Sequence, residues 1–291
     1  MLVEAKSDGR IRPFVNLHFG NDNTKANHTK IPEQNTIRNA VPSGRFRSKI
    51  DLSDGYLQTR VHPDDVKYNT IKTPFGGLTS PVMMQQDMNA PGPCVRTMED
   101  LFHGELRKNT WVYIHNIFVF SHTCEEHVKD LTSACSKLQN ADYYANPKKS
   151  VFFATKLDIL GYMIDDNGIY LAQEKIRTTR DWKRPESQNE IQLFNRMVNY
   201  ISQFIPHIAT LTAPPTALSR NAEWLWTDLG EAAFEAGKRA ADKPKVRRPI
   251  AYNKPDMIWL FTEASPTGTA AWIGQGPTRD AARPAAPTAA S

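Results

Sequence analysis

Few side chains in the 291-residue sequence have the types and spacing that metal or acid–base chemistry requires. Two pairs of neighbouring carboxylates, Asp64–Asp65 and Asp165–Asp166, are candidate oxygen ligands for a hard divalent cation. The first pair follows His62–Pro63, a pattern typical of the start of a helix. The second pair runs into a turn sequence, Asp166–Gly168. We interpret both pairs as surface carboxylates.

A polar pair, His115–Asn116, stands in the middle of the clearest hairpin candidate of the sequence. It separates two apolar arms, Trp111–Ile114 and Ile117–Phe120, which are rich in β-branched and aromatic residues. Such arms predict two paired strands with the polar pair at the turn. Apolar residues on both faces of each arm indicate that the hairpin is buried in a sheet.

The elements around this hairpin run from strands to helices and back to strands, which is typical of an α+β protein. A strand begins near Phe46, and a turn follows at Ser53–Gly55. Capping boxes at Thr123–Glu126 and Ser187–Glu190 begin two helices. The expected inward faces are Val128, Leu131, Cys135 and Leu138 in the first helix, and Ile191, Phe194, Val198, Ile201 and Ile205, before Pro206, in the second. Further predicted elements are a strand at Ile11–Val15, a helix at Asp228–Ala241, and strands at Met257–Thr262 and Gly268–Gln275.

Composition is typical of a globular protein with a sizeable core, and the cysteines, the N-terminus and the hydropathy lead us to expect a soluble protein of the cytoplasm or nucleus. Hydrophobic residues make up 40% of it, and 36 basic against 31 acidic residues give a net charge of +5, which is weak support for a nucleic-acid partner. The three cysteines, Cys94, Cys124 and Cys135, form no CxxC pair, which favours free thiols in a reducing compartment. The sequence has no secretory signal and no apolar run of the roughly 20 residues that a membrane span needs.

An ordered series of segments resembles the reverse transcriptase of gypsy-type LTR retrotransposons, in wording closest to fungal elements. The series covers about Leu2 to Pro284. Its members are Phe46–Tyr56 (first palm motif), Met88–Pro91, Val112–Ser121 (in place of the Tyr-x-Asp-Asp hairpin), Ile159–Gly161 with Asp166–Gly168 (primer grip), Leu193–Pro206 (thumb), and Ile258–Ser265 with Ile273–Pro277 (start of the RNase H-like domain).

The resemblance implies a right-hand polymerase of the α+β class. Residues 1–165 would form N-terminally truncated fingers and a palm with an antiparallel sheet and flanking helices. Residues 166–245 would form the helical thumb and connection. Residues 246–284 would form a truncated RNase H-like domain, and residues 285–291 a disordered tail.

The family joins nucleotides with two magnesium ions held by three aspartates, and this sequence has one of the three. Asp51 matches the first position, whereas His115 and Asn116 occupy the other two. An amide oxygen is a weak ligand, and imidazole suits softer ions than magnesium. Losing one metal would slow the reaction on the order of 10³-fold or more, so we expect Mg²⁺ or Mn²⁺ to bind poorly and DNA synthesis to be absent.

Other family positions are present in part. Tyr56 and Arg12 match nucleotide contacts, although a core tyrosine and an exposed loop arginine fit them equally well. Lys148 and Lys149 lie on a turn before the primer grip, where they fit contacts to backbone phosphate, although a solvated basic surface is the alternative. Gly161 belongs to the primer-grip motif itself.

The RNase H remnant is also incomplete. Glu263 matches the first catalytic aspartate of that domain, and its other acidic ligands would follow Ser291.

Three readings of present-day function remain open. The chain is a decayed transposon frame, a module that binds an RNA/DNA primer–template without chemistry, or an active RNA-directed DNA polymerase with an unusual metal such as manganese.

Overall fold

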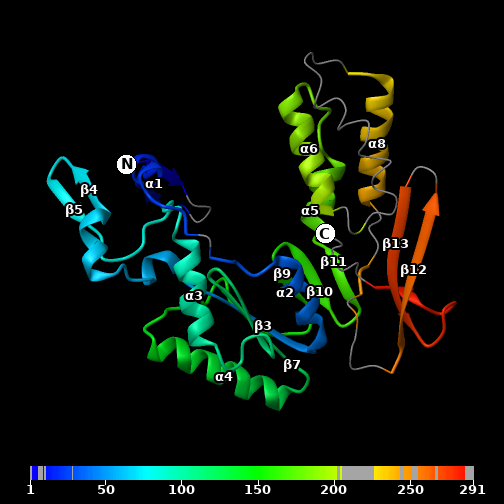
Figure 1. Ribbon diagram of the computed structural model, residues 1–291, viewed down its shortest axis with the longest axis horizontal. Helices are drawn as coiled ribbons and strands as arrows, with labels where there is room; N and C mark the ends of the chain where they lie inside the picture. Colours follow the sequence, from blue (N-terminus) through cyan, green and yellow to red (C-terminus); the bar gives the residue numbers. More distant parts are fainter. Residues whose placement is uncertain are drawn as a thin grey trace. The chain divides into compact units, whose positions relative to one another are not determined.

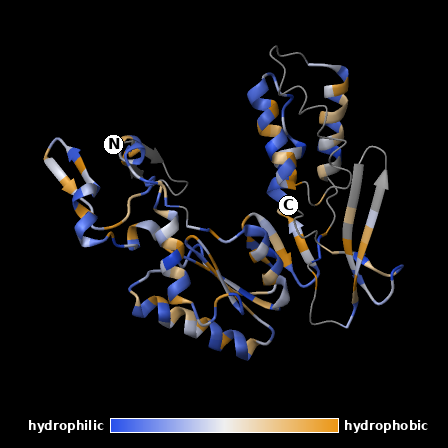
Figure 2. Cartoon of the chain, viewed as in Figure 1, coloured by the Kyte–Doolittle hydropathy of each residue, from blue (hydrophilic) through white to orange (hydrophobic). Residues whose placement is uncertain are grey.

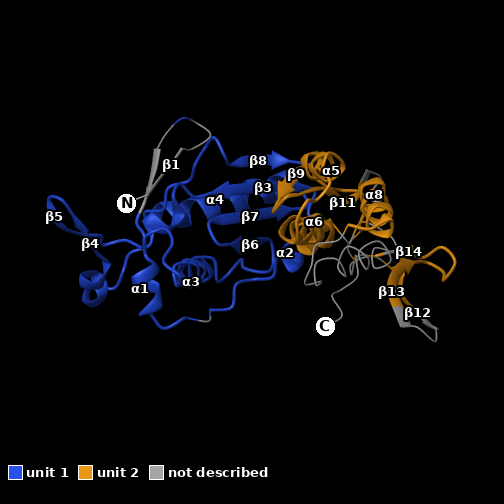
Figure 3. Cartoon of the chain, turned by 90° about the horizontal axis from the view of Figure 1, so that it is seen from above, with its two compact units in different colours: residues 1–37, 44–155 blue, residues 38–43, 156–291 orange. Residues whose placement is uncertain are grey.

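The computed structural model describes residues 2–5, 9, 11–27, 29–201, 204, 226–242, 246–248, 250, 255–265 and 268–285. The chain divides into two compact units (Figure 3). The first unit comprises Met1–Ile37 and Gly44–Thr155, and the second comprises Arg38–Ser43 and Lys156–Ser291.

A four-stranded antiparallel sheet is the frame of the first unit (Figure 1). Its order is β6 (Thr110–Tyr113), β7 (Asn116–Ser121), β3 (Phe46–Asp51) and β8 (Val151–Ala154). Two helices, α3 (Pro91–Leu101) and α4 (Cys124–Asn140), share a core with it. The buried members of that core are Ile50, Leu52, Met98, Phe102, Val112, Ile117, Val119, Leu131, Ala134 and Leu138.

Alternation along the strands separates this core from the candidate site. Ile50 faces the helices, and successive side chains of a strand point to opposite faces of the sheet. Ser48 therefore shares the face of Ile50, whereas Asp51 shares the other face with Lys49 and Arg47. Asp51, which matches the family's first aspartate, and the core that packs against the helices therefore lie on opposite faces of β3.

The predicted hairpin is confirmed, but its turn lies one residue earlier than expected. β6 ends at Tyr113 and β7 begins at Asn116, so Ile114 and His115 form the turn. Ile114 has a φ of 55°, in the left-handed region that two-residue hairpins use. Polarity alone predicts both residues of the pair at the turn, whereas Asn116 is a strand residue that pairs with Tyr113.

The predicted start of α4 is confirmed, and its predicted inward face is partly wrong. Thr123 Oγ1 accepts from Glu126 N at 3.2 Å, and Glu126 Oε2 accepts from Thr123 N at 3.1 Å. Val128 is 49% exposed and Cys135 is exposed. The residues that α4 buries are His127, Leu131, Ala134 and Leu138. A histidine was not counted as a core residue, and this shifted the predicted face by one position.

Smaller elements complete the first unit. These are β1 (Leu2–Ala5) paired with β2 (Ile11–Phe14), α1 (His18–Asp22), most of α2 (Gln34–Ala40), the 3₁₀ helices η2 (Gly55–Gln58) and η3 (Pro63–Asn69), and β4 (Thr70–Thr73) paired with β5 (Gly76–Thr79). The predicted strand near residue 11 is therefore confirmed.

The second unit begins with a three-stranded antiparallel sheet. Its order is β11 (Gly168–Leu171), β10 (Tyr162–Asp165) and β9 (Leu157–Ile159). The 3₁₀ helix η1 (Val41–Ser43) and the end of α2 belong to this unit. The Arg38 guanidinium lies 4.1 Å from the centre of the Tyr162 ring, a cation–π contact within this unit. A boundary at residue 165, as the sequence suggested, would separate the paired strands β10 and β11.

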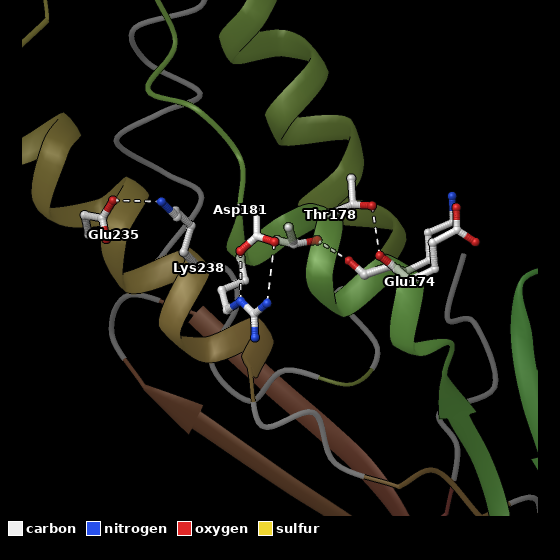
Figure 4. A network of polar contacts seen from close by, with 8 residues as sticks. Glu174, Thr178, Asp181, Glu235 and Lys238 are labelled. Carbon is white, nitrogen blue, oxygen red and sulfur yellow. Dashed lines mark hydrogen bonds and ion pairs between the residues drawn. The ribbon is translucent and has the colours of Figure 1, made fainter.

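Three helices of the second unit are α5 (Gln173–Arg180), α6 (Gln188–Ile201) and α8 (Asp228–Asp242). Both α6 and α8 carry apolar and polar residues (Figure 2). Ile191, Phe194, Val198 and Ile201 are buried as predicted, while Ile205 and Pro206 lie outside the described residues. Two ion pairs lie on the polar sides of these helices (Figure 4). Arg180, at the end of α5, is paired with Asp181 at 2.9 Å, and Lys238 is paired with Glu235 within α8 at 3.2 Å.

The last described strands are β12 (Met257–Ser265) and β13 (Gly268–Gly276), both longer than predicted, followed by the short β14 (Arg283–Pro284). They form an antiparallel sheet in this order. Its RNase H-like assignment stays a prediction. The predicted tail lies outside the described residues from position 286 onward. Within the part of the chain that the structure describes, no helix has the length and apolarity needed to cross a bilayer.

Candidate active site

The candidate active site lies where three strands of the first unit end together. Asp51, the last residue of β3, is directly opposite Asn116, the first residue of β7. Asn116 is also paired with Tyr113 at the end of β6. Leu52 N donates to His115 O at 3.0 Å, which joins the turn to the chain after Asp51. The structure thus brings together Asp51, His115 and Asn116, as the sequence predicted.

The turn before β8 holds the backbone of Asp51 from its other side. Asn146 N donates to Asp51 O at 2.7 Å, and Asp51 N donates to Ser150 Oγ at 3.1 Å. Ser150 Oγ in turn donates to Asn146 O at 2.8 Å. Residues 146–150 are therefore fixed to the strand end that carries the carboxylate, a contact that the sequence did not reveal.

His115 is a half-buried neutral base beside the carboxylate. Burial lowers the pKa of its imidazole, the Asp51 carboxylate opposes this shift, and the charge of Lys149 adds to it. A Cβ on Gly55 would lie 2.7 Å from His115 Cβ, so only glycine fits against the turn there. At neutral pH the position therefore presents an uncharged imidazole.

The residues present do not fit the two magnesium ions of the family chemistry. The cluster offers one carboxylate, one imidazole and one amide. Among the described residues, no three His, Cys, Asp or Glu side chains gather in a way that would hold a metal ion. Magnesium requires oxygen ligands in near-octahedral geometry, and two such ions beside a triphosphate require more negative charge than one carboxylate supplies.

Tyr56 lies next to this cluster in η2. Burial raises the pKa of its hydroxyl, and Cys94 and Tyr113 raise it further. Cys94 is buried, and its thiol lies 3.8 Å from Ile114 O at the hairpin turn. Gln34 Nε2 donates to the Tyr113 hydroxyl at 2.7 Å. Gln34 was missed as a neighbour of the site, because only the chain fold brings it to the hairpin.

The predicted nucleic-acid contacts lie in different units. Lys148 and Lys149 are exposed in the turn before β8, and Lys149 is close enough to influence His115. Gly161 lies in the second unit, in the turn between β9 and β10. It has a φ of 82°, and a Cβ there would lie 2.5 Å from the Tyr200 hydroxyl oxygen. Backbone conformation and the packing of Tyr200 thus give Gly161 a structural role.

The backbone positions of Arg12 and Glu263 are known, but their side chains lie outside the described part. Arg12 is in β2 opposite Glu4, and Glu263 is in β12 opposite Ala270. Their predicted roles stay predictions.

The other carboxylate pairs have the local roles expected of surface residues. Asp64 and Asp65 are exposed in the first turn of η3. Asp165 Oδ1 accepts from Asn167 N at 2.8 Å and from Gly168 N at 3.2 Å, which closes the β10–β11 turn.

Comparison with known proteins agrees with this architecture. The family described as reverse transcriptase (RNA-dependent DNA polymerase) matches residues 4–164, more than half of the chain. The Transposon Tf2-7 polyprotein of Schizosaccharomyces pombe is 28% identical over 277 residues, and the Transposon Tf2-3 polyprotein is 27% identical over 276. Each alignment covers 94% of this chain and 21% of the relative. The chain thus spans about a fifth of the length of these curated relatives.

Solved structures show the same fold. A foamy viral protease-reverse transcriptase in complex with double-stranded DNA superposes with a TM-score of 0.86 at 20% identity, over 98% of this chain and 50% of that one. A second structure, in complex with an RNA/DNA hybrid, gives 0.81 at 20% identity, over 98% and 38%. The polymerase fold and the resemblance expected from the motifs are confirmed. This chain belongs to the reverse transcriptase (RNA-dependent DNA polymerase) family.

Proposed function

We propose that this chain binds a primer–template with the fold of a gypsy-type reverse transcriptase but does not synthesise DNA. One observation carries the proposal: the position opposite Asp51 across β3 and β7 is an amide, Asn116, and the turn beside it carries an imidazole, His115. Phosphoryl transfer depends on metal ions that neutralise charge developing on the triphosphate. One carboxylate cannot hold two such ions, so the step should be slower on the order of 10³-fold or more.

Nucleic-acid binding needs none of the lost carboxylates. Contacts to phosphates depend on positive charge, tolerate sequence change and do not require bound metal. Lys148 and Lys149 are exposed on a turn that two hydrogen bonds fix to Asp51. The two reverse transcriptase structures compared above are complexes with double-stranded DNA and with an RNA/DNA hybrid. These observations support a bound primer–template as the ligand of this chain.

The salt dependence of duplex binding tests this proposal. Fluorescence anisotropy with a labelled RNA/DNA primer–template, at several salt concentrations, gives the slope of log K against log salt. The variant Lys148→Ala/Lys149→Ala should lower the magnitude of that slope by about two, since each phosphate contact contributes about 0.9. The control Lys108→Ala/Lys129→Ala removes the same charge from the loop before β6 and from α4, and its slope should not change.

Two results would contradict the proposal. Absence of salt-dependent binding by the unchanged chain would favour the decayed-frame reading. Equal slopes for both double variants would show that binding is non-specific and does not use the turn before β8.

A further inference from the structure

A chain of hydrogen bonds is buried between α4 and the sheet of the first unit. His127 is fully buried on α4, at 0% exposure. Its Nε2 lies 2.8 Å from Ser48 Oγ on β3, and its Nδ1 lies 3.0 Å from Ser121 Oγ on β7. Ser48 is also fully buried, and Ser121 is 5% exposed. One imidazole therefore joins the helix to two strands.

The partners at the two ends determine which groups donate and which accept in this series of hydrogen bonds. Ser121 Oγ donates to Asp130 Oδ2 at 2.7 Å, so its oxygen accepts from His127 Nδ1–H. His127 Nε2 is then an acceptor, and Ser48 donates its hydroxyl to it. Ser48 Oγ accepts in turn from Phe153 N at 3.1 Å. Each polar group in the series is satisfied by a neutral imidazole.

Phe153 lies at an irregularity in the ladder between β3 and β8. Arg47 is paired with Ala154 and Lys49 with Val151, so β8 contains one residue more than β3 over this stretch. This is the signature of a β-bulge. Phe153 has a φ of 55°, and its ring meets the His127 imidazole edge-on, with centroids 4.9 Å apart and an interplanar angle of 83°. Ser48 and His127 thus contact the bulged residue at its amide and at its ring.

The bulged strand continues directly from the turn at the candidate site. Asn146 and Ser150 bond to the backbone of Asp51 at the start of this segment. Arg47 Nη1 donates to Thr155 O at 2.6 Å at its end. Between these anchors the regular ladder is interrupted, and the extra residue of a bulge has no partner in the ladder. The bond from Phe153 N to Ser48 Oγ lies in that interval.

We propose that His127 is a positioning residue for the turn that carries Lys148 and Lys149. By accepting from Ser48, it orients the Ser48 oxygen toward Phe153 N and fixes the bulge of β8. The fixed bulge sets the register of residues 146–155 and hence the place of the two lysines beside Asp51. The consequence for nucleic-acid binding rests on the proposed function, whereas the effect on residues 146–155 does not.

Hydrogen–deuterium exchange of the full chain tests the structural part without any ligand. Ser48→Ala removes the oxygen that accepts from Phe153 N, and should raise exchange in residues 146–155 about tenfold, the effect of one buried hydrogen bond. His127→Leu should do the same, whereas His127→Gln keeps an acceptor and should preserve protection. Ser133→Ala is the matched control. Ser133 lies on α4, as His127 does, but its hydroxyl donates to Glu105 Oε1 and has no bond to β8 in this series.

The exchange rates separate a positioning role from a general loss of packing. Faster exchange confined to residues 146–155 in Ser48→Ala, with Ser133→Ala unchanged, supports the proposal. If His127→Leu does not fold, Ser48→Ala and His127→Gln decide. Unchanged exchange in Ser48→Ala, equal acceleration in Ser133→Ala, or loss of protection in His127→Gln would overturn it.

A double-mutant cycle tests the link to binding. Ser48→Ala should weaken primer–template binding several-fold in the unchanged chain and have no effect in the Lys148→Ala/Lys149→Ala background. An undiminished effect in that background would overturn the link. If the unchanged chain binds no duplex, the proposed function fails, while the exchange experiment still decides the role of His127.

Discussion

The two ends of the β3–β7 strand pair differ in how completely their polar groups are used. At one end, the carboxylate of Asp51 is opposite the amide of Asn116, beside a neutral His115. Toward the other end, Ser48 and Ser121 form a continuous hydrogen-bonded series with His127. Folding depends on the second end, because unsatisfied buried polar groups are costly there. The first end can therefore change its chemistry while the fold is kept.

Neighbouring residues of β3 offer the strongest test of this difference. Ile50→Ala should lower the free energy of unfolding of the first unit by about 2–5 kcal/mol, because Ile50 is 1% exposed in the core. Asp51→Asn, one position later, should change it by less than about 1 kcal/mol. Hydrogen–deuterium exchange of the β7 amides, under conditions in which they exchange through global unfolding, measures the change in unfolding free energy for both variants. A loss in Asp51→Asn as large as in Ile50→Ala would show that the site end also supports the fold.

Acid should weaken the His127 end. Burial lowers the pKa of His127, and Asp130 opposes the shift. The folded state therefore binds a proton less readily than the unfolded state, whose histidine titrates near pH 6.5. Stability is present above that pH and is lost as the pH falls, by at most about 1.4 kcal/mol per pH unit. His127→Gln should reduce this slope in denaturant titrations between about pH 7 and 5, and an unchanged slope would contradict the assignment.

A buried side-chain amide in the second unit contrasts with the His127 series, in which every buried polar group is hydrogen-bonded. Asn195 is 9% exposed on α6, and among the residues that the structure describes its Oδ1 has no hydrogen-bond partner. Asn195→Leu should raise the stability of α6 by about 1–2 kcal/mol, because it removes a buried unpaired acceptor. Arg196→Leu, at the next and exposed position, is the control and should have little effect. Loss of stability in Asn195→Leu would mean that the amide has a packing role of its own.

The sequence predicted the elements better than it predicted their partners. The hairpin, the capping box at Thr123–Glu126 and the strand ending at Asp51 follow from local patterns and from the family motifs. The inward position of His127 was missed, because its burial depends on two serines that lie 79 and 6 residues away. The hydrogen bonds of Asn146 and Ser150 to the backbone of Asp51 were missed for the same reason. Contacts between distant segments leave no local periodicity to detect.

Primer extension on an RNA template, in magnesium and in manganese, tests the central claim most directly. The unchanged chain would be compared with His115→Asp/Asn116→Asp, which restores the two carboxylates. We predict no extension by the unchanged chain and metal-dependent extension by the double variant, since the fold that positions these residues is intact. Extension by the unchanged chain in either metal would contradict the account, because a working metal site would then be built from other residues.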